Sequence, residues 1–475
     1  TLDALTDASY HVAVGYQALT TSTCGDNNVA VGYQSLKLTT VGSKNTAVGN
    51  VAMTANTTGA NNVAVGRSAL TNNTTGSNNT ASGTYSLYKN TTAADNAAFG
   101  TSALQNNTTG TLNTSVGRLS LYNNTTANYN TAVGSCALYS NTTGHSNIAM
   151  GFKTLLANTT GTHNVAVGMQ ALLCQDSGVG NTGIGGSALM CNTASNNTSI
   201  GNNSTCANTT GSCLVAVGIN ALRKNTTGAR NVAVGFSALC ANTTGNFNTA
   251  SGYMAAQANT TGCDNVATGF CSLHVNTTGC LNVAIGRRAL ALNTTASLNT
   301  AVGGCSLYAN TTGTNNTAVG YQALKTNECS NDNTAVGTYA LCLTTGHSNT
   351  AVGKSAVQAN STGALNTGIG KFALSSNTTA CYNTAVGGCA LYDNSTGAEN
   401  TATGYLALGD NTTGAENTAI GYLALRLTTT GSCNVGIGPH VLYTNTTGAK
   451  NIAIGRVAMY KNTSGCHNTA SGYGA

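Results

Sequence analysis

Residues 62–78 read NVAVGRSALTNNTTGSN, and this 17-residue pattern recurs along nearly the whole chain of 475 residues. Its glycine, Gly66, belongs to a series of 28 glycines that runs from Gly15 to Gly472 in steps of 17 residues. The exceptions are two steps of 16 residues, from Gly185 to Gly201 and from Gly337 to Gly353. We number each repeat from this glycine as position 0. No linker interrupts the series, so we predict a single domain over residues 1–475, with a partial first coil at 1–10 and an incomplete last coil at 472–475.

The residue types within one repeat predict strands and turns. Positions −4 to −1, for example residues 45–48 (NTAV), are short and rich in Val, Ile and Thr, which favours a strand. A second short segment around positions +3 and +4 is predicted to form a second strand, on the opposite long side of the coil. The Asn-Thr-Thr-Gly tract that follows has the chemistry of a turn. A helix–turn–helix repeat needs about 33 residues, so the repeat fits one coil of a flattened solenoid instead.

The predicted fold is therefore all-β: a parallel β-solenoid (β-roll) of about 28 coils and, at about 4.8 Å per coil, a length of roughly 130 Å. Position +4 is Leu in 22 of the 27 repeats that reach it, and position −1 is mostly Val or Ile. We expect these two columns to face each other and to form a thin Val/Leu core. Each repeat buries little alone, and stacking builds a continuous core.

Asparagine at position −4 is the most uniform side chain of the repeat. It occupies 26 of the 27 positions from Asn28 to Asn468, and only Leu214 departs. We interpret the column as a structural ladder in which side-chain amides bond along the stack. A periodic ligand-binding column is the alternative. The predicted ladder includes Asn45, Asn62, Asn79, Asn164, Asn282, Asn366 and Asn451.

The composition argues against catalysis, nucleic-acid binding and membrane insertion. Charged residues make up 6% of the chain, the net charge is +6, and the Lys and Arg residues are scattered rather than clustered. No apolar stretch approaches the roughly 18 residues that a membrane span needs. No acid–base pair recurs in register, and no zinc spacing, phosphate-binding loop or regular calcium-binding Asp is present. We therefore expect no enzyme activity, no catalytic, cofactor-binding or metal-binding residues, and no cofactor.

A second asparagine column, at position +7, supports two interpretations. Twenty of its members form Asn-x-Ser/Thr sequons. One interpretation is a row of N-glycans on a secreted chain, although glycans on every coil would crowd one another. The other is that Asn-Thr-Thr-Gly is simply good turn chemistry. The candidate glycosylation sites are Asn56, Asn73, Asn107, Asn158, Asn225, Asn310, Asn411 and Asn445.

Two pairs among the 17 cysteines fall in register on consecutive repeats. Cys174 and Cys191 both occupy position +6, and Cys263 and Cys280 both occupy position +11. Stacked residues have Cα atoms about 4.8 Å apart, within the range that a disulfide tolerates. We predict a disulfide at each pair, which together with the sequons indicates an oxidising, extracellular setting. Because 17 is odd, at least one thiol is free or pairs with another chain.

Columns of Thr and Tyr suggest two further surfaces. Regular Thr rows on a flat face are typical of ice-binding solenoids, and Thr recurs here at −3, +8 and +9. The adjacent Thr at +8 and +9 would point to opposite sides of an extended chain, so a flat two-column Thr face is not expected. Tyr recurs at +1 and +5, where rows of rings would stack or form a contact surface.

The ends of the sequence suggest self-association. Joining Gly472 of one copy to Gly15 of another gives a spacing of 18 residues, which is one coil with a single insertion, and Leu2 would fall next to the +4 column. Subunits stacked head to tail in this way would form an open filament. Trimming of a longer chain is the alternative.

Two stretches carry a family resemblance. Residues 45–49 (NTAVG) and 282–286 (NVAIG) resemble the repeats of YadA-like trimeric autotransporter adhesin heads, and residues 316–324 (NTAVGYQAL) resemble repeats of phage and bacterial tail-fibre-like proteins. The resemblance covers essentially the whole chain and implies a parallel β-roll, often a homotrimer, that is exposed at a surface and used for attachment. The repeat here is longer than the usual adhesin repeat, and cysteines are not expected in that family.

From these features we expect a structural fibrous protein at an extracellular, cell or virion surface, as a subunit of a filament or appendage that stacks head to tail. The alternatives are an adhesin head or tail-fibre shaft that binds a receptor, with a trimer as one form of assembly, and an ice-binding solenoid. The expected partners are other copies of the chain, with glycans possible and neither nucleic acid nor membrane insertion involved.

Overall fold

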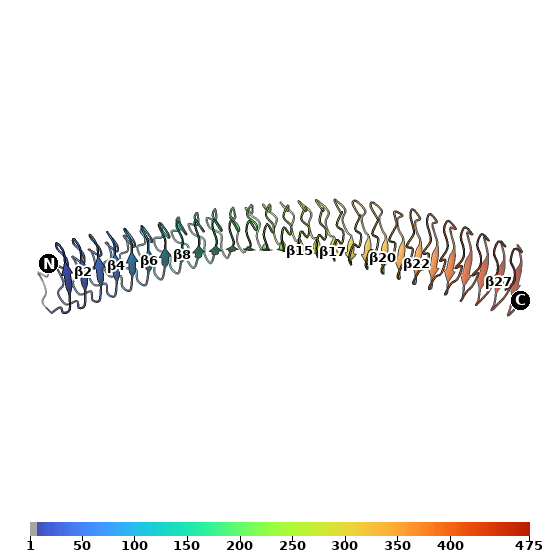
Figure 1. Cartoon of the computed structure of the whole chain (residues 1–475), viewed down its shortest axis with the longest axis horizontal. Coiled ribbons are helices and arrows are strands. Elements are labelled where there is room, and N and C mark those ends of the chain that lie inside the picture. Colours follow the sequence, from blue (N-terminus) through green and yellow to red (C-terminus); the bar gives the residue numbers. More distant parts are fainter. Residues whose placement is uncertain (1–6) are drawn as a thin grey trace. The chain divides into compact units, whose positions relative to one another are not determined.

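The computed structural model describes residues 7–475, and these divide into two compact units that meet in sequence between Val234 and Gly235. Both units consist of the same coil, repeated as a parallel β-solenoid (Figure 1). The predicted fold class is thus confirmed. Residues 1–6 of the predicted partial coil, including Leu2, lie outside the described residues. How the two units join as one domain stays a prediction.

In the first unit, every coil contributes one three-residue strand at positions −3 to −1. The strands are β1 (Val12–Val14), β2 (Val29–Val31), β3 (Thr46–Val48), β4 (Val63–Val65), β5 (Thr80–Ser82), β6 (Ala97–Phe99), β7 (Thr114–Val116), β8 (Thr131–Val133), β9 (Ile148–Met150), β10 (Val165–Val167), β11 (Thr182–Ile184), β12 (Thr198–Ile200), β13 (Val215–Val217) and β14 (Val232–Val234).

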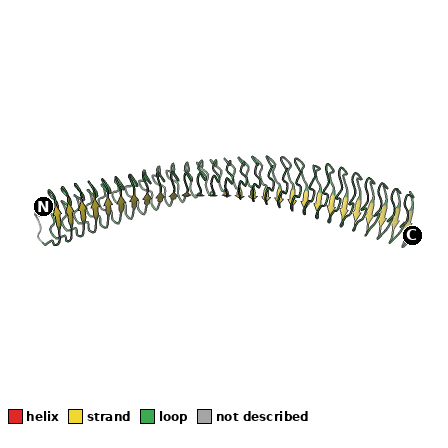
Figure 2. Ribbon diagram, viewed as in Figure 1, coloured by secondary structure: helices red, strands yellow, loops and turns green. Residues whose placement is uncertain are grey.

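The second unit repeats this arrangement, and the strands of each unit lie along one side of its coils, with turns and loops forming the remainder (Figure 2). The strands are β15 (Thr249–Ser251), β16 (Val266–Thr268), β17 (Val283–Ile285), β18 (Thr300–Val302), β19 (Thr317–Val319), β20 (Thr334–Val336), β21 (Thr350–Val352), β22 (Thr367–Ile369), β23 (Thr384–Val386), β24 (Thr401–Thr403), β25 (Thr418–Ile420), β26 (Val435–Ile437), β27 (Ile452–Ile454) and β28 (Thr469–Ser471).

Consecutive strands pair in parallel without a register shift. In β3 and β4, for example, Thr46 lies beside Val63 and Val48 lies beside Val65. The backbone amide of Thr46 donates to the carbonyl of Asn62 at 2.8 Å, so the ladder extends one residue beyond the strand itself. Each position of the repeat is therefore stacked directly on the same position of the next coil.

The opposite long side of the coil is not a strand, and the predicted second strand is wrong. Positions +2 and +4 have left-handed backbone conformations, with φ of 52° at Gln34 and 49° at Leu36. Left-handed backbone is unfavourable for a residue with a side chain, but here it turns the amides toward neighbouring coils. The amide of Gln34 donates to the carbonyl of Tyr16 at 2.8 Å, and that of Leu36 donates to the carbonyl of Ala52 at 3.1 Å. Hydrogen bonds between coils thus continue without β-structure.

The core consists of Leu and Ala rather than of Leu and Val. Leu at +4, Ala at +3 and Ala at −2 are fully buried, as Leu70, Ala69 and Ala64 illustrate. Successive side chains of a strand point to opposite faces, so with −2 inside, positions −3 and −1 point outward. Val65 at −1 is 41% exposed. The expected Val/Leu core is corrected accordingly, and burial of each leucine stabilises the stack by about 1.5–3 kcal/mol.

The glycine at position 0 is required by both conformation and space. Gly49 has φ of +144°, and a Cβ built on it would lie 2.4 Å from the carbonyl oxygen of Gly66 in the next coil. The obstructing atoms are backbone, which cannot rotate away. This explains why all 28 repeats retain the residue.

The asparagine ladder at −4 is confirmed. The Nδ2 group of Asn62 donates to Oδ1 of Asn45 at 3.1 Å and to the carbonyl of Gly76 at 2.8 Å. Its own Oδ1 accepts from the amide of Asn79 at 2.9 Å. These side chains are fully buried, so the ladder satisfies the backbone of the turn in the interior of the coil.

The two shortened repeats lose their residue in the turn, and the ladders adapt. In the first, Asn192 Nδ2 donates to the carbonyl of Ala194, two residues ahead instead of three. In the second, Thr344 occupies position +7 and accepts a hydrogen bond from Asn360 Nδ2 at 2.9 Å. Deletions at this edge therefore leave the strand and the core in register.

Within residues 7–475, no helix is long and apolar enough to cross a membrane.

Candidate functional surfaces

The predicted glycosylation sites lie inside the coil. All eight candidate asparagines are fully buried, and they form a second ladder at +7. Nδ2 of Asn73 donates to Oδ1 of Asn56 and to the carbonyl of Gly76, both at 2.8 Å. An N-glycan is attached through this same nitrogen, so the folded coil has no room for one and would lose both hydrogen bonds. The turn interpretation of Asn-Thr-Thr-Gly fits the structure and the glycan interpretation does not.

The structure brings one predicted cysteine pair close together. The Sγ atoms of Cys263 and Cys280 are 2.9 Å apart, and both residues are present as thiols. This separation exceeds the length of about 2.05 Å of a disulfide bond, so the predicted bond is not formed here. The hydrogen bond to Cys280, with burial as the next cause, raises the pKa of Cys263 to about 12.

The second predicted pair is also a pair of thiols. Burial, followed by the neighbouring Cys191, raises the pKa of Cys174. Both pairs lie on adjacent coils at the same position of the repeat, as the sequence spacing predicted. Both disulfides remain predictions that depend on an oxidant.

Aromatic side chains stack along the coils at the predicted rim positions. At +1, the ring of Tyr253 lies parallel to those of Phe236 and Phe270, with centroids 5.3 Å apart in each case. At +5, the rings of Tyr443 and Tyr460 stack nearly parallel, with centroids 5.1 Å apart and an angle of 3° between the ring planes. These short stacks stabilise neighbouring coils by about 0.5–1.5 kcal/mol per pair.

Side chains that ligate metals do not gather in the described part of the chain. Residues 7–475 contain no group of three or more His, Cys, Asp or Glu side chains that could hold a metal ion. Arg426 and Asp410, on adjacent coils, form an ion pair. Both side chains are partly exposed, so the pair bridges two coils at the surface.

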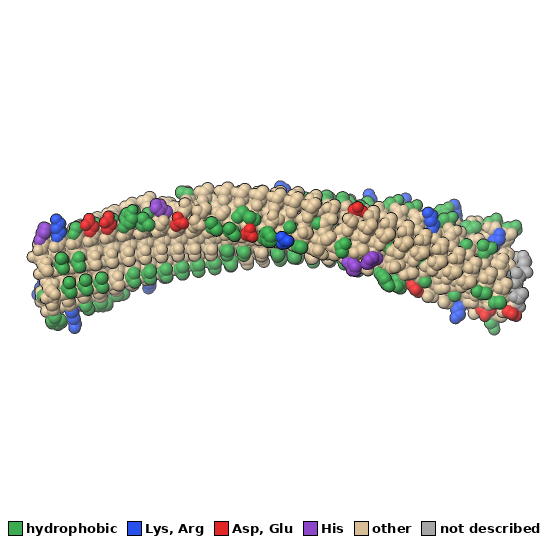
Figure 3. Space-filling model, turned by 180° about the vertical axis from the view of Figure 1, so that it is seen from behind, with side chains coloured by type: hydrophobic (Ala, Val, Ile, Leu, Met, Phe, Trp, Pro, Cys, Tyr) green, Lys and Arg blue, Asp and Glu red, His purple; other side chains and the backbone are tan. Residues whose placement is uncertain are grey.

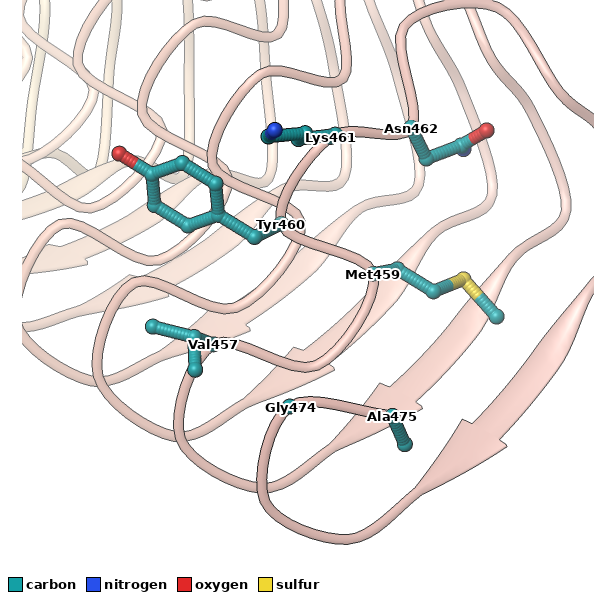
Figure 4. Close-up of a pocket in the computed structure, with 7 residues that line it drawn as sticks. All are labelled: Val457, Met459, Tyr460, Lys461, Asn462, Gly474 and Ala475. Carbon is teal, nitrogen blue, oxygen red and sulfur yellow. The ribbon is translucent and has the colours of Figure 1, made fainter.

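One cavity lies at the last coil of the second unit (Figure 4). Its lining includes Val457, Met459 and Asn462, which occupy positions +2, +4 and +7 of their repeat. In the other coils, the next repeat covers these positions. The cavity is therefore the space that a following repeat fills in the other coils, and Tyr460 and Lys461 also line it.

The surface that sequence reasoning missed is the outward face of the strands. Positions −3 and −1 both face solvent, and in the described strands neither position ever carries a charged residue. The signal was present in the sequence: position −2, between them, is only ever Ala, Gly or Ser. A small residue flanked by two β-branched residues indicates an inward-facing small side chain with both neighbours outside.

Comparison with known proteins does not assign the chain to a family. No family model matches the sequence, and no curated protein matches it. The functional argument consequently depends on the coil itself.

Proposed function

We propose that this protein has a structural role, as a building block of an extracellular, cell-surface or virion-surface fibre. The observation that carries the proposal is that every coil devotes the same residues to contacts with the next one. Leu70 and Ala64 fill the interior, and Asn62 and Asn73 satisfy the turn from within. Nearly all the variation between repeats falls on exposed positions, which is the pattern of a scaffold rather than of a localised binding site.

The same contacts support self-association. One edge of a coil is complementary to the opposite edge of the next, so an uncovered edge in one molecule is complementary to the opposite edge of another copy. Open β-edges readily pair in this manner, and a contact of this kind propagates into a filament. The stacked cysteine pairs would reinforce such a fibre in an oxidising setting.

Cryo-electron microscopy of the native material tests this proposal. A continuous thread with one chain in cross-section is the expected result. Discrete rods of three chains around a common axis would contradict it and favour the second candidate, a trimeric adhesin head or tail-fibre shaft. That candidate is favoured by the resemblance of residues 282–286 to adhesin repeats, and it would need the outward strand face as its interface.

A further inference from the structure

Eight consecutive coils of the second unit present a threonine at every −3 position. The neighbouring −1 positions of the same strands carry Val, Ile or, once, Thr. We call this surface, on β18–β25, the threonine face. Its −3 column is Thr300, Thr317, Thr334, Thr350, Thr367, Thr384, Thr401 and Thr418, and its −1 column is Val302, Val319, Val336, Val352, Ile369, Val386, Thr403 and Ile420.

The threonine face is regular in both directions. Parallel pairing without register shift places Thr350 beside Thr367 and Val352 beside Ile369. Rows are therefore about 4.8 Å apart along the stack, and the two columns are separated by two residues of strand, or about 6.6 Å. Every side chain of the two columns is β-branched and hence restricted at χ1, so hydroxyl and methyl groups repeat at fixed positions.

The side chains of the face are also level. The exposed fractions at −1 lie between 36% and 40% for Val319, Val336, Val352, Ile369, Val386 and Ile420. No glycine leaves a gap, and no charged or long side chain projects from either column. Figure 3 shows hydrophobic side chains in a row along this side of the unit.

The hydroxyl groups of the face distinguish between possible occupants. None of the eight threonine hydroxyls of the −3 column forms a hydrogen bond with another described residue. Threonines at +8 behave differently, since Oγ1 of Thr378 donates to the carbonyl of Ser395 and Oγ1 of Thr412 donates to the carbonyl of Thr429, both at 3.0 Å. A dry interface with a second copy would bury the free hydroxyls beside Val and Ile, which is unfavourable unless each finds a partner.

We propose that the threonine face binds the surface of ice. Water molecules held in register along the face would satisfy each hydroxyl and pack around the methyl groups. The spacing of the coils is close to the repeat of water oxygens in hexagonal ice, so an array of eight rows can match a crystal plane. Charged side chains, which would hold water in other orientations, are confined to other positions of the coil. The regular face therefore consists of a threonine column at −3 beside a mostly Val and Ile column at −1, and not of the threonines at +8 and +9.

The test is partition of the full-length protein into slowly growing ice, measured with three proteins. Thr367→Lys alters the centre of the face. Thr379→Lys makes the same change at the exposed +9 position two residues beyond Asn377, in the turn of the same unit. The unchanged chain is expected to enter the ice. The fraction of Thr367→Lys that enters should be at least about tenfold smaller, which corresponds to a loss of about 1.4 kcal/mol of binding free energy. The fraction of Thr379→Lys that enters should equal that of the unchanged chain.

Circular dichroism of each variant establishes that it is folded. A second face variant, Thr350→Lys, covers the case in which Thr367→Lys does not fold. Exclusion of the unchanged chain from ice would overturn the proposal, as would equal partition of the face and turn variants. A fall in mass on sedimentation of the face variants, without a change in ice partition, would also overturn it and identify a second copy of the chain as the occupant.

Discussion

Replacing one ladder asparagine provides the most direct test of what holds the coils together. Asn62→Ala removes the Oδ1 atom that accepts from the backbone amide of Asn79 at 2.9 Å. It also removes the Nδ2 donor to Gly76, but the carbonyl of Gly76 keeps a second donor, Nδ2 of Asn73 at 2.8 Å. Asn79 Nδ2 likewise keeps its bond to the carbonyl of Ala93. The amide of Asn79 is thus the one group left without a partner by the substitution.

The expected cost follows from this count. A buried donor without a partner costs about 1–3 kcal/mol, and the bonds lost elsewhere contribute about 0.5–1.5 kcal/mol each. Three such bonds are lost, those of Asn62 Nδ2 to Asn45 and Gly76 and that of Asn79 Nδ2 to Asn62. We therefore expect Asn62→Ala to lower the local free energy of opening by about 2.5–7.5 kcal/mol. The matched control is Asn72→Ala, whose side chain is partly exposed and makes no hydrogen bond within the described residues, and which should change stability by less than about 0.5 kcal/mol.

Hydrogen exchange read by mass spectrometry is the appropriate assay, because a stacked-repeat protein need not unfold in one step. Peptides that contain the Asn79 amide should lose protection in Asn62→Ala and keep it in Asn72→Ala, with distant coils unaffected. Equal protection of this amide in both variants would refute the ladder as a source of stability.

Three further results are expected. Gly49→Ala should destabilise its coil by more than about 3 kcal/mol, because backbone atoms of the next coil block the Cβ and φ is positive. Gly59→Ala should cost less, since other repeats already carry Ala at that position, as at Ala93 and Ala127. Denaturant melts of the two variants test the difference. Oxidised glutathione should join Cys263 to Cys280 by a disulfide and stabilise the coil by about 3 kcal/mol. Because the folded pKa of Cys263 is raised to about 12, the reactive thiolate is scarce at neutral pH, and the rate of disulfide formation should rise with pH. Equal rates at pH 7 and pH 9, measured by mass spectrometry after alkylation, would contradict this. Protein secreted from a eukaryotic host should carry no glycan at Asn73 in its folded fraction, and a glycopeptide from that site in a sample with full hydrogen-exchange protection would contradict the buried ladder.

Much of the coil could be predicted from the sequence because the repeat is so regular. A step of 17 residues sets the size of the coil, Val and Thr at −3 to −1 place the strand, and the near-invariant asparagine at −4 predicts a ladder that the hydrogen bonds of Asn62 confirm. These are local properties, and their recurrence at a constant spacing forces identical residues to stack.

The sequence did not predict the conformation of the opposite long side. The segment around Ala69 and Leu70 is apolar and short, which is compatible with a strand. In the structure every second residue of this segment has left-handed backbone instead, with φ of 55° at Ser68 and 52° at Leu70. Hydrogen bonds to the coils above and below compensate for this conformation, and such bonds exist only once the coils are stacked. The same stacking gives Asn73 its partners and makes a sequon into an interior ladder.

The tertiary structure also decided which side of each strand faces inward, and with it the candidate functional surface. A period of two residues permits either Val65 or Ala64 to face the core. The interior is too narrow for the larger side chain: a Cβ added at Gly436 would lie 2.2 Å from Cδ1 of Leu425, and one at Gly183 would lie 3.3 Å from Cγ of Leu172. Only Ala, Gly or Ser fits at −2, so the β-branched residues on either side of it are directed to solvent.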